Sequence, residues 1–360
     1  MDLPRPALGL RFLALLALAL AGPAARAAGL RDVPASDPHF AYDGRFDASD
    51  PARPVVIWEA STVAIDFSGP QAAVRFGDVK DQVFFDATLD GTTSVIRAAP
   101  GSIGLPVSGS GRHHLILFKR TEATAGTAVF LGISVAADAR VRTPRKPDYR
   151  MTMHFIGDSI TAGACDEDGP SDQWEDRGTH DAAYSWAALT AAAFHADYQN
   201  LSVSGIGMAA GWDNGLLEDM VWDRVYPDPK SPKADLTHWK PDVIFIYLGE
   251  NDDSYPREHH LPFPPDYVAN YEALYRKVRA AAPRAHIVLV TGGMWGGHNS
   301  PELAAAWGKV AADLEREDGA VSHFRFQHWS QNHPRVADHK AMAAEIIAWL
   351  GTQPFMLRFK

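Results

Sequence analysis

The sequence has 360 residues, which is enough for two domains of ordinary size and a substantial hydrophobic core. Hydrophobic residues make up 46% of the chain and ten residues are tryptophan, a composition that excludes a largely disordered protein. The formal net charge is −10, and it becomes −12 without residues 1–27, which carry three arginines and one aspartate. This acidic balance argues against nucleic acid as a partner.

Residues 1–28 have the pattern of a signal peptide. Arginines precede or open an apolar stretch at residues 12–21, and small residues follow it. The stretch is too short to span a bilayer, and no later segment reaches 18 apolar residues. We therefore expect cleavage near Ala27 or Ala28, and a mature protein that is exported to the periplasm or the extracellular medium without a membrane anchor. Cys165 is the only cysteine, so no internal disulfide is expected.

The region from about residue 41 to residue 135 consists of short β-rich runs separated by turn signals. These runs lie at residues 55–58, 63–67, 72–76, 83–85, 114–118 and 128–133. Their length and spacing predict a β-sandwich of the jelly-roll kind over residues 29–145. Two prolines and five basic residues between Arg140 and Arg150 predict a linker and a domain boundary there.

The period of the hydrophobic pattern changes after this linker. Apolar strands are predicted at residues 151–156, 198–203, 243–248, 286–290 and 324–326, and they alternate with helices predicted at 184–195, 267–282, 302–317 and 336–350. This alternation predicts a three-layer αβα domain with a largely parallel five-stranded sheet over residues 146–360. Ligands bind beyond the carboxyl ends of such strands, and Ser159, Gly205, Asn251 and His333 each follow a predicted strand.

Ser159 stands at the start of a probable helix, after a buried strand. Free backbone N–H groups and the positive end of the helix dipole meet a serine at that place, and they favour an oxyanion beside its hydroxyl. A catalytic nucleophile and a simple helix cap both fit this position, since serine is also a preferred N-cap. The other three positions at the same edge of the sheet favour catalysis.

Four short segments carry a family resemblance: residues 157–161 (GDSIT), 204–207 (SGIG), 249–252 (GEND) and 333–334 (HP). In this order, each after a strand, they resemble the conserved blocks of the SGNH (GDSL-type) hydrolases. Residues 42–46 and 114–122 resemble the β-domain that precedes the catalytic domain in carbohydrate esterase family 2, and residues 333–339 resemble that family as well. Known members of the family are deacetylases of acetylated plant polysaccharides that act without a cofactor.

The resemblance implies a role for each of the four positions. Ser159 would be the nucleophile, and His333 would be the general base that takes its proton and returns it to the leaving hydroxyl. The backbone amides of Ser159 and Gly205 and the side-chain amide of Asn251 would form the oxyanion hole.

The chain departs from the wider superfamily at the third member of the triad. Many SGNH hydrolases carry an aspartate three residues before the histidine, and here that position is Ser330. We therefore expect a Ser159–His333 dyad in which a backbone carbonyl near Ser330 accepts the imidazole N–H. Asp338 is the nearest following carboxylate, but it lies in a predicted helix, and we expect it to cap or solvate that helix.

Further aromatic and acidic residues each allow a functional and a purely structural interpretation. Trp212, Trp295 and Trp329 follow predicted strands, where they would form a stacking platform for a sugar ring or simply pack in the core. The acidic stretch at residues 166–181 fits a solvated loop better than a cation site. The histidines lack zinc-ligand spacing, so we expect no metal, and the family resemblance implies no cofactor.

The sequence as a whole predicts an exported serine esterase that removes O-acetyl groups from a plant polysaccharide or oligosaccharide through an acyl-enzyme intermediate. Two alternatives remain open at this stage. One is a carbohydrate-binding protein with an inactive SGNH domain, and the other is a sugar O-acetyltransferase that uses the same site.

Overall fold

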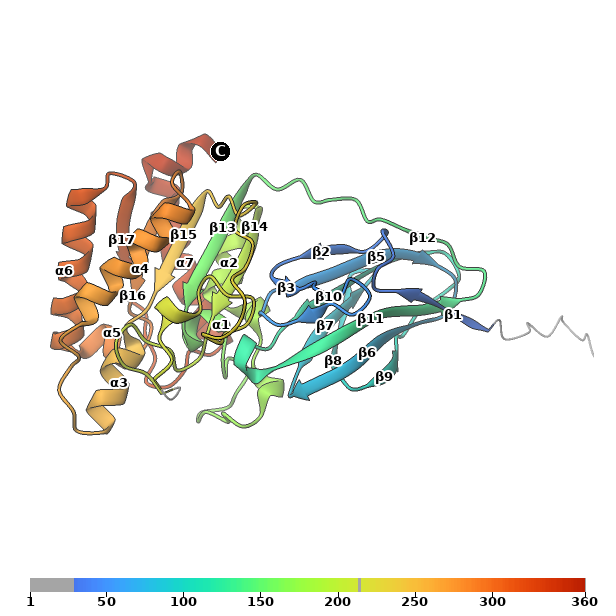
Figure 1. Ribbon diagram of the computed structural model, residues 1–360, viewed down its shortest axis with the longest axis horizontal. Coiled ribbons are helices and arrows are strands. Elements are labelled where there is room, and N and C mark those ends of the chain that lie inside the picture. The colour runs from blue at the N-terminus through green and yellow to red at the C-terminus, as the bar shows by residue number, and fades with distance from the viewer. Residues whose placement is uncertain (1–28, 213–214, 360) are drawn as a thin grey trace, which may run out of the picture.

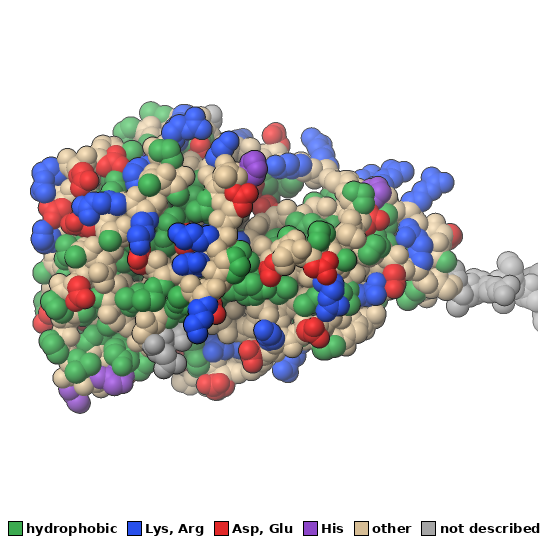
Figure 2. Space-filling view, in the orientation of Figure 1, with side chains coloured by type: hydrophobic (Ala, Val, Ile, Leu, Met, Phe, Trp, Pro, Cys, Tyr) green, Lys and Arg blue, Asp and Glu red, His purple; other side chains and the backbone are tan. Residues whose placement is uncertain are grey.

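The computed structural model describes residues 29–212 and 215–359, which form two domains side by side along the long axis of the molecule (Figure 1). The predicted signal peptide, residues 1–28, lies outside the described residues. Among the described helices, none is both long and apolar enough to cross a membrane. Acidic and basic side chains are interspersed over both domains on the face shown in Figure 2.

The N-terminal domain is a β-sandwich of two six-stranded sheets, as predicted. One sheet has the order β3-β4-β11-β6-β9 with β1 paired to β11, and the other has the order β12-β5-β10-β7-β8 with β2 paired to β5; all of these pairs are antiparallel. The strands are β1 (Leu30–Pro34), β2 (Ala41–Asp43), β3 (Phe46–Asp47), β4 (Val55–Val56), β5 (Thr62–Ser68), β6 (Ala72–Asp81), β7 (Phe84–Leu89), β8 (Thr92–Arg97), β9 (Gly101–Gly104), β10 (Arg112–Lys119), β11 (Gly126–Ala136) and β12 (Val141–Arg142).

Alternating burial explains why these strands form and how they pack. Along β10 the side chains alternate between exposed or half-buried and buried positions, as expected of a strand with one face on a core. Phe76 and Phe85 come from opposite sheets and stack with ring centroids 5.2 Å apart, so they fill the space between the sheets. The start of the predicted linker is ordered, because β12 pairs with β5.

The C-terminal domain has five parallel strands in the order β14-β13-β15-β16-β17, which confirms the predicted three-layer architecture. The strands are β13 (Met151–Gly157), β14 (Ala196–Ser202), β15 (Val243–Tyr247), β16 (His286–Thr291) and β17 (Val321–Arg325). The α-helices are α1 (Ser159–Ala162), α2 (Trp186–Ala193), α3 (Glu250–Glu258), α4 (Tyr267–Ala281), α5 (Trp295–Asn299), α6 (Pro301–Glu317) and α7 (Val336–Thr352). Helices α4 and α6 pack on one face of the sheet, and α2 and α7 pack on the other (Figure 1).

The central strands are buried on both faces, which explains their continuous apolar sequences. Every residue of β15 is buried. Phe155 and Phe245 stack at 4.7 Å on the face that α2 and α7 cover, whereas Ile156 and Ile246 lie in the core on the other face. Strand β17 begins at Val321, three residues before the predicted start, and helices α3 and α5 were not predicted.

The two domains share a core, so the sandwich is fixed against the C-terminal domain. Trp58 is fully buried among residues of the C-terminal domain, and its indole N–H donates to the carbonyl of Val225 at 2.8 Å. The Arg45 guanidinium donates to the carbonyls of Trp222 and Arg224 at 2.7 and 2.9 Å. These contacts satisfy loop carbonyls that would otherwise be buried without a donor.

Candidate active site

The serine of the GDS segment lies where the first strand of the sheet turns into a helix. Asp158 is the N-cap of α1, and its carboxylate accepts the backbone N–H of Ile160 at 3.0 Å, so the helix is capped by the aspartate and Ser159 is its first residue. Gly157 is required by close packing, because a Cβ there would lie 2.4 Å from the hydroxyl of Thr161. Burial raises the pKa of Asp158 well above its usual range.

The structure brings His333 to Ser159 across 174 positions of sequence. The imidazole Nε2 lies 2.9 Å from the Ser159 hydroxyl oxygen, which is hydrogen-bonding distance. His333 follows β17 and stands shortly before α7, so the histidine and the serine meet at the same edge of the sheet. Such a pair can transfer the hydroxyl proton to the imidazole as the oxygen attacks an electrophile.

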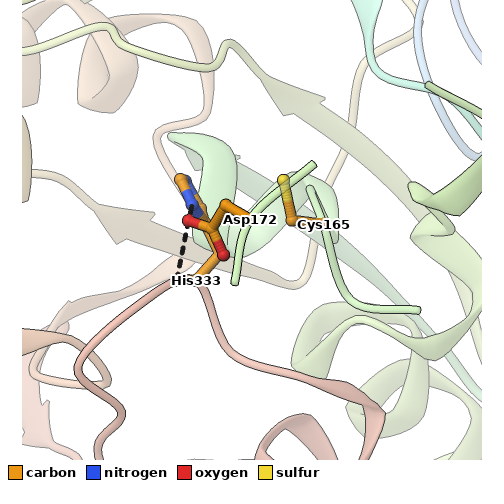
Figure 3. A group of neighbouring side chains, drawn as sticks. All are labelled: Cys165, Asp172 and His333. Carbon is orange, nitrogen blue, oxygen red and sulfur yellow. Dashed lines mark hydrogen bonds and ion pairs between the residues drawn. The ribbon is translucent and has the colours of Figure 1, made fainter. Parts of the chain in front are cut away.

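The partner of the other imidazole nitrogen differs from the prediction. The Nδ1 atom of His333 lies 2.7 Å from a carboxylate oxygen of Asp172, so a carboxylate, and not a backbone carbonyl near Ser330, holds the ring (Figure 3). The expected dyad is wrong in this respect, because the long connection between α1 and α2 carries Asp172 to the histidine. The three side chains therefore have the geometry of a Ser-His-Asp triad.

Arg335 fixes Asp172 in place. Its guanidinium lies 2.8 Å from the second carboxylate oxygen of Asp172, and it donates to the backbone carbonyls of Cys165 and Gly169 at 2.9 and 2.8 Å. Burial raises the pKa of Asp172, but the hydrogen bond and charge of His333, together with Arg335, outweigh burial and hold that pKa below its usual range. Asp172 is therefore ionised at neutral pH.

Neither Ser330 nor Asp338 contacts the imidazole of His333 through a hydrogen bond in the described structure. The Ser330 hydroxyl donates to the carbonyl of Asn332 at 2.6 Å, and its backbone N–H donates to the carbonyl of Gly293. Asp338 accepts the backbone N–H of Arg335 at 2.9 Å, which confirms that it caps α7.

The loop that contains Gly205 is held by the GEND segment. The Asn251 side-chain amide donates to the carbonyl of Ile206 at 2.7 Å. The Asp252 carboxylate is fully buried and accepts the backbone N–H groups of residues 208, 209 and 210 at 2.6 to 3.1 Å. Gly207 must remain glycine, because a Cβ there would lie 1.8 Å from the carbonyl of Ala210. Asn251 from α3 and Gly205 from this loop thus line the same cleft as Ser159.

An open cleft of about 700 Å³ surrounds these groups. Of the three predicted platform residues, Trp212 and Trp295 line it, whereas Trp329 is not among its described lining residues and stacks on His298 at 4.9 Å. Trp174 also lines the cleft and stacks against the His333 ring at 5.6 Å. Sequence reasoning missed Trp174 because no regular element precedes it.

The glycine-rich segment at residues 291–297 positions Trp295. The Glu250 carboxylate accepts the backbone N–H groups of Gly296 and Gly297 at 2.6 and 2.8 Å, and a Cβ at Gly296 would lie 2.7 Å from that carboxylate. Arg257 covers the Trp295 ring at 4.4 Å. The glycines therefore allow a buried carboxylate to approach the backbone that carries a cleft tryptophan.

One group of side chains in the described structure has the spacing of metal ligands. Ligand atoms of Cys165, Asp172 and His333 lie within 4.8 Å of one another (Figure 3). Asp172 and His333 are already bonded to each other, and burial raises the pKa of the Cys165 thiol above its usual range, which disfavours the thiolate that a metal requires. The arrangement suits proton transfer better than metal binding.

Comparison with known proteins identifies the family. The model of the GDSL-like Lipase/Acylhydrolase family matches residues 155–342, and the model of the Carbohydrate esterase 2 N-terminal domain matches residues 42–144. The fold and the site therefore define a GDSL-type acylhydrolase. The chain belongs to carbohydrate esterase family 2, and it is a carbohydrate esterase.

Individual relatives match both domains. The acetylxylan esterase / glucomannan deacetylase of Cellvibrio japonicus is 30% identical over 325 residues, which cover 84% of this chain and 87% of that protein. Cellulase/esterase CelE of Acetivibrio thermocellus is 30% identical over 337 residues, but the match spans only 39% of its length. A family two carbohydrate esterase from Clostridium thermocellum, solved with cellohexaose, has a TM-score of 0.76 and 29% identity, covering 86% of this chain and 98% of that chain.

The triad geometry predicts that Asp172→Asn lowers kcat for p-nitrophenyl acetate by about 10³- to 10⁴-fold with little change in KM, because the imidazole loses the group that orients it and stabilises its charged form. Asp338→Asn is the matched control, since this carboxylate caps α7 and does not touch the His333 ring. It should retain most activity and lose about 1 kcal/mol of unfolding free energy. Equal activity losses in the two variants would contradict the assignment of Asp172.

The buried carboxylates predict that the protein becomes less stable as the pH rises from about 6.5 to about 8. Burial raises the pKa of Glu250 to about 7 and that of Glu59 to about 8, so the folded state holds protons that the unfolded state has lost. Burial lowers the pKa of His154, His180 and His339 to about 3, and because unfolded histidine has a pKa of about 6.5, these groups oppose the trend mostly below about pH 7.

Urea unfolding across this pH window measures the effect. We expect a decline on the order of 1 kcal/mol for each of the two carboxylates. In Glu250→Gln the decline should be shallower than in the wild type. An unfolding free energy that stays constant or rises with pH would contradict the prediction.

Proposed function

We propose that this protein removes O-acetyl groups from an acetylated plant polysaccharide or oligosaccharide through an acyl-enzyme intermediate. The observation that carries the proposal is the Ser159–His333–Asp172 relay, with spacings of 2.9 and 2.7 Å, at the edge of an open cleft that tryptophans line. Relatives support the class of substrate, since one is named an acetylxylan esterase / glucomannan deacetylase and another was solved with cellohexaose.

In the first half of the reaction, the Ser159 oxygen attacks the acetyl carbonyl carbon while the imidazole Nε2 of His333 takes the hydroxyl proton. Asp172 keeps the Nδ1 proton of the ring in place and stabilises the imidazolium. Negative charge develops on the carbonyl oxygen, which faces the backbone N–H groups of Ser159 and Gly205 and the side-chain amide of Asn251. Collapse of this intermediate releases the sugar oxygen, which receives the proton from His333.

In the second half, His333 takes a proton from water and the resulting hydroxide attacks the acetyl-serine carbonyl. The same oxyanion hole stabilises the second tetrahedral intermediate, and its collapse returns the proton to Ser159 and releases acetate. The cleft is open to solvent, which suits a polymer whose acetyl group enters while the sugar chain remains outside. The signal pattern at residues 1–28 supports export to a compartment outside the cytoplasm, where the protein would encounter such a polymer.

Acetate release from acetylated xylan and acetylated glucomannan tests the proposal. Ser159→Ala and His333→Ala should each lower kcat by at least about 10⁴-fold, as expected of members of a catalytic unit. Asn251→Ala should cost about 10² to 10³, because it removes one oxyanion donor. Wild-type protein that releases no acetate from either polymer or from p-nitrophenyl acetate would refute the proposed activity.

The tryptophans of the cleft give a separate prediction about sugar binding. Trp212 is 43% exposed and lines the cleft, so Trp212→Ala should raise KM for acetylated xylan several-fold and leave p-nitrophenyl acetate hydrolysis nearly unchanged. Trp329→Ala is the control, because this ring packs on His298 outside the described cleft lining. Equal KM values for wild type and Trp212→Ala would exclude this ring as a sugar platform.

A further inference from the structure

The β-sandwich contributes directly to the active-site cleft. The chain between β10 and β11 forms a short turn at Ala123–Ala125, and Thr124 in this turn lines the cleft together with Ser159 and His333. Glu122 immediately precedes the turn and is only 1% exposed. A buried carboxylate is costly unless hydrogen bonds and charges compensate it, so its contacts show what it serves.

The Glu122 carboxylate contacts three residues that line the cleft. One oxygen accepts the backbone N–H of Ser204 at 3.1 Å. The other accepts the hydroxyl of Thr124 and lies 3.9 Å from the Arg177 guanidinium. All three partners line the cleft, so one carboxylate of the β-sandwich joins two segments of the catalytic domain at the site.

Both segments lead directly to the catalytic groups. Ser204 precedes Gly205, and the contacts from Asn251 and Asp252 begin only at Ile206. Backbone bonds hold Val203 and Ile206, and Glu122 adds the side-chain contact at Ser204, next to Gly205. On the other side, the Arg177 guanidinium covers the Trp174 ring at 4.1 Å, and that ring stacks on the imidazole of His333.

We propose that Glu122 is a positioning residue of the esterase, which places the Gly205 N–H of the oxyanion hole from the β-sandwich. This inference rests on the proposed function, because it assigns Gly205 to the oxyanion hole. Preorganised donors stabilise a transition state only when they already point at the developing charge, so a small displacement of Gly205 lowers kcat more than it changes substrate binding.

Glu59 provides a matched comparison within the same interface. It is also 1% exposed, it also comes from the β-sandwich, and it accepts the backbone N–H of Ser202 at 2.8 Å. Ser202, however, is held independently of Glu59, because it is the last residue of β14 and pairs with Gly157 of β13. Loss of the Glu59 contact should therefore affect stability without moving Gly205.

Three variants test the inference in the full chain with p-nitrophenyl acetate. Glu122→Asp keeps the charge but withdraws the carboxylate by one methylene, and kcat should fall about 10- to 100-fold with KM within about 3-fold of wild type. Glu59→Asp makes the same change at the control position, and kcat should stay within about 3-fold. Glu122→Gln keeps an acceptor for the Ser204 N–H and should retain more of kcat than Glu122→Asp. Circular dichroism and thermal unfolding verify folding.

The outcomes separate this inference from the proposed function. Inactive wild-type protein refutes the proposed function itself. With active wild type, equal kcat values for wild type and Glu122→Asp overturn the positioning role. So do equal losses in Glu122→Asp and Glu59→Asp, or a Glu122→Asp chain that does not fold, since either result makes Glu122 a residue of general stability.

Discussion

The geometry of this site depends on buried carboxylates that accept backbone N–H groups. Loops leaving a parallel sheet carry N–H groups without a strand partner, and these groups require acceptors when water is excluded. Asp158 supplies one for α1, Asp252 supplies one for residues 208–210, and Glu250 supplies one for Gly296 and Gly297. Each cleft segment is therefore fixed by a buried carboxyl group that accepts its backbone N–H groups.

These contacts hold the cleft loops in place without a substrate. Burial raises the pKa of Asp252 to about 6, while three backbone donors hold it down, so the carboxylate and its loop stabilise one another. In the proposed reaction, donors on a loop held in this way would face the developing charge without rearrangement. These buried acids lower the stability of the folded protein when they are ionised, because a buried carboxylate is less favourable than a buried neutral carboxyl group.

The sequence predicted the elements whose patterns are local. Strand β15 is a continuous apolar run, and Ser159 follows a strand of the same kind, so the strand and the position of the serine were both predicted. Short motifs predicted Asn251 and His333. Asp172 was not predictable, because its place depends on Arg335, which bonds the carbonyls of Cys165 and Gly169 from 170 and 166 positions away. No periodicity records such a contact. Strands β8 and β9 were missed for a related reason, since their exposed side chains give no apolar run.

The position of Asp172 shows that the geometry of the imidazole, and not the order of residues along the chain, determines where the acid must lie. His333 requires only a carboxylate oxygen at its Nδ1 atom, and any segment that reaches this point can supply it. Here the 165–172 segment does so. The Ser330 backbone N–H instead donates to the Gly293 carbonyl, a contact between the segments that follow β17 and β16. The absence of an aspartate before the histidine is therefore compatible with a complete relay. The acid comes instead from a loop that an arginine beside the histidine holds. Arg335 is this arginine, since it contacts both Asp172 and the carbonyl of His333.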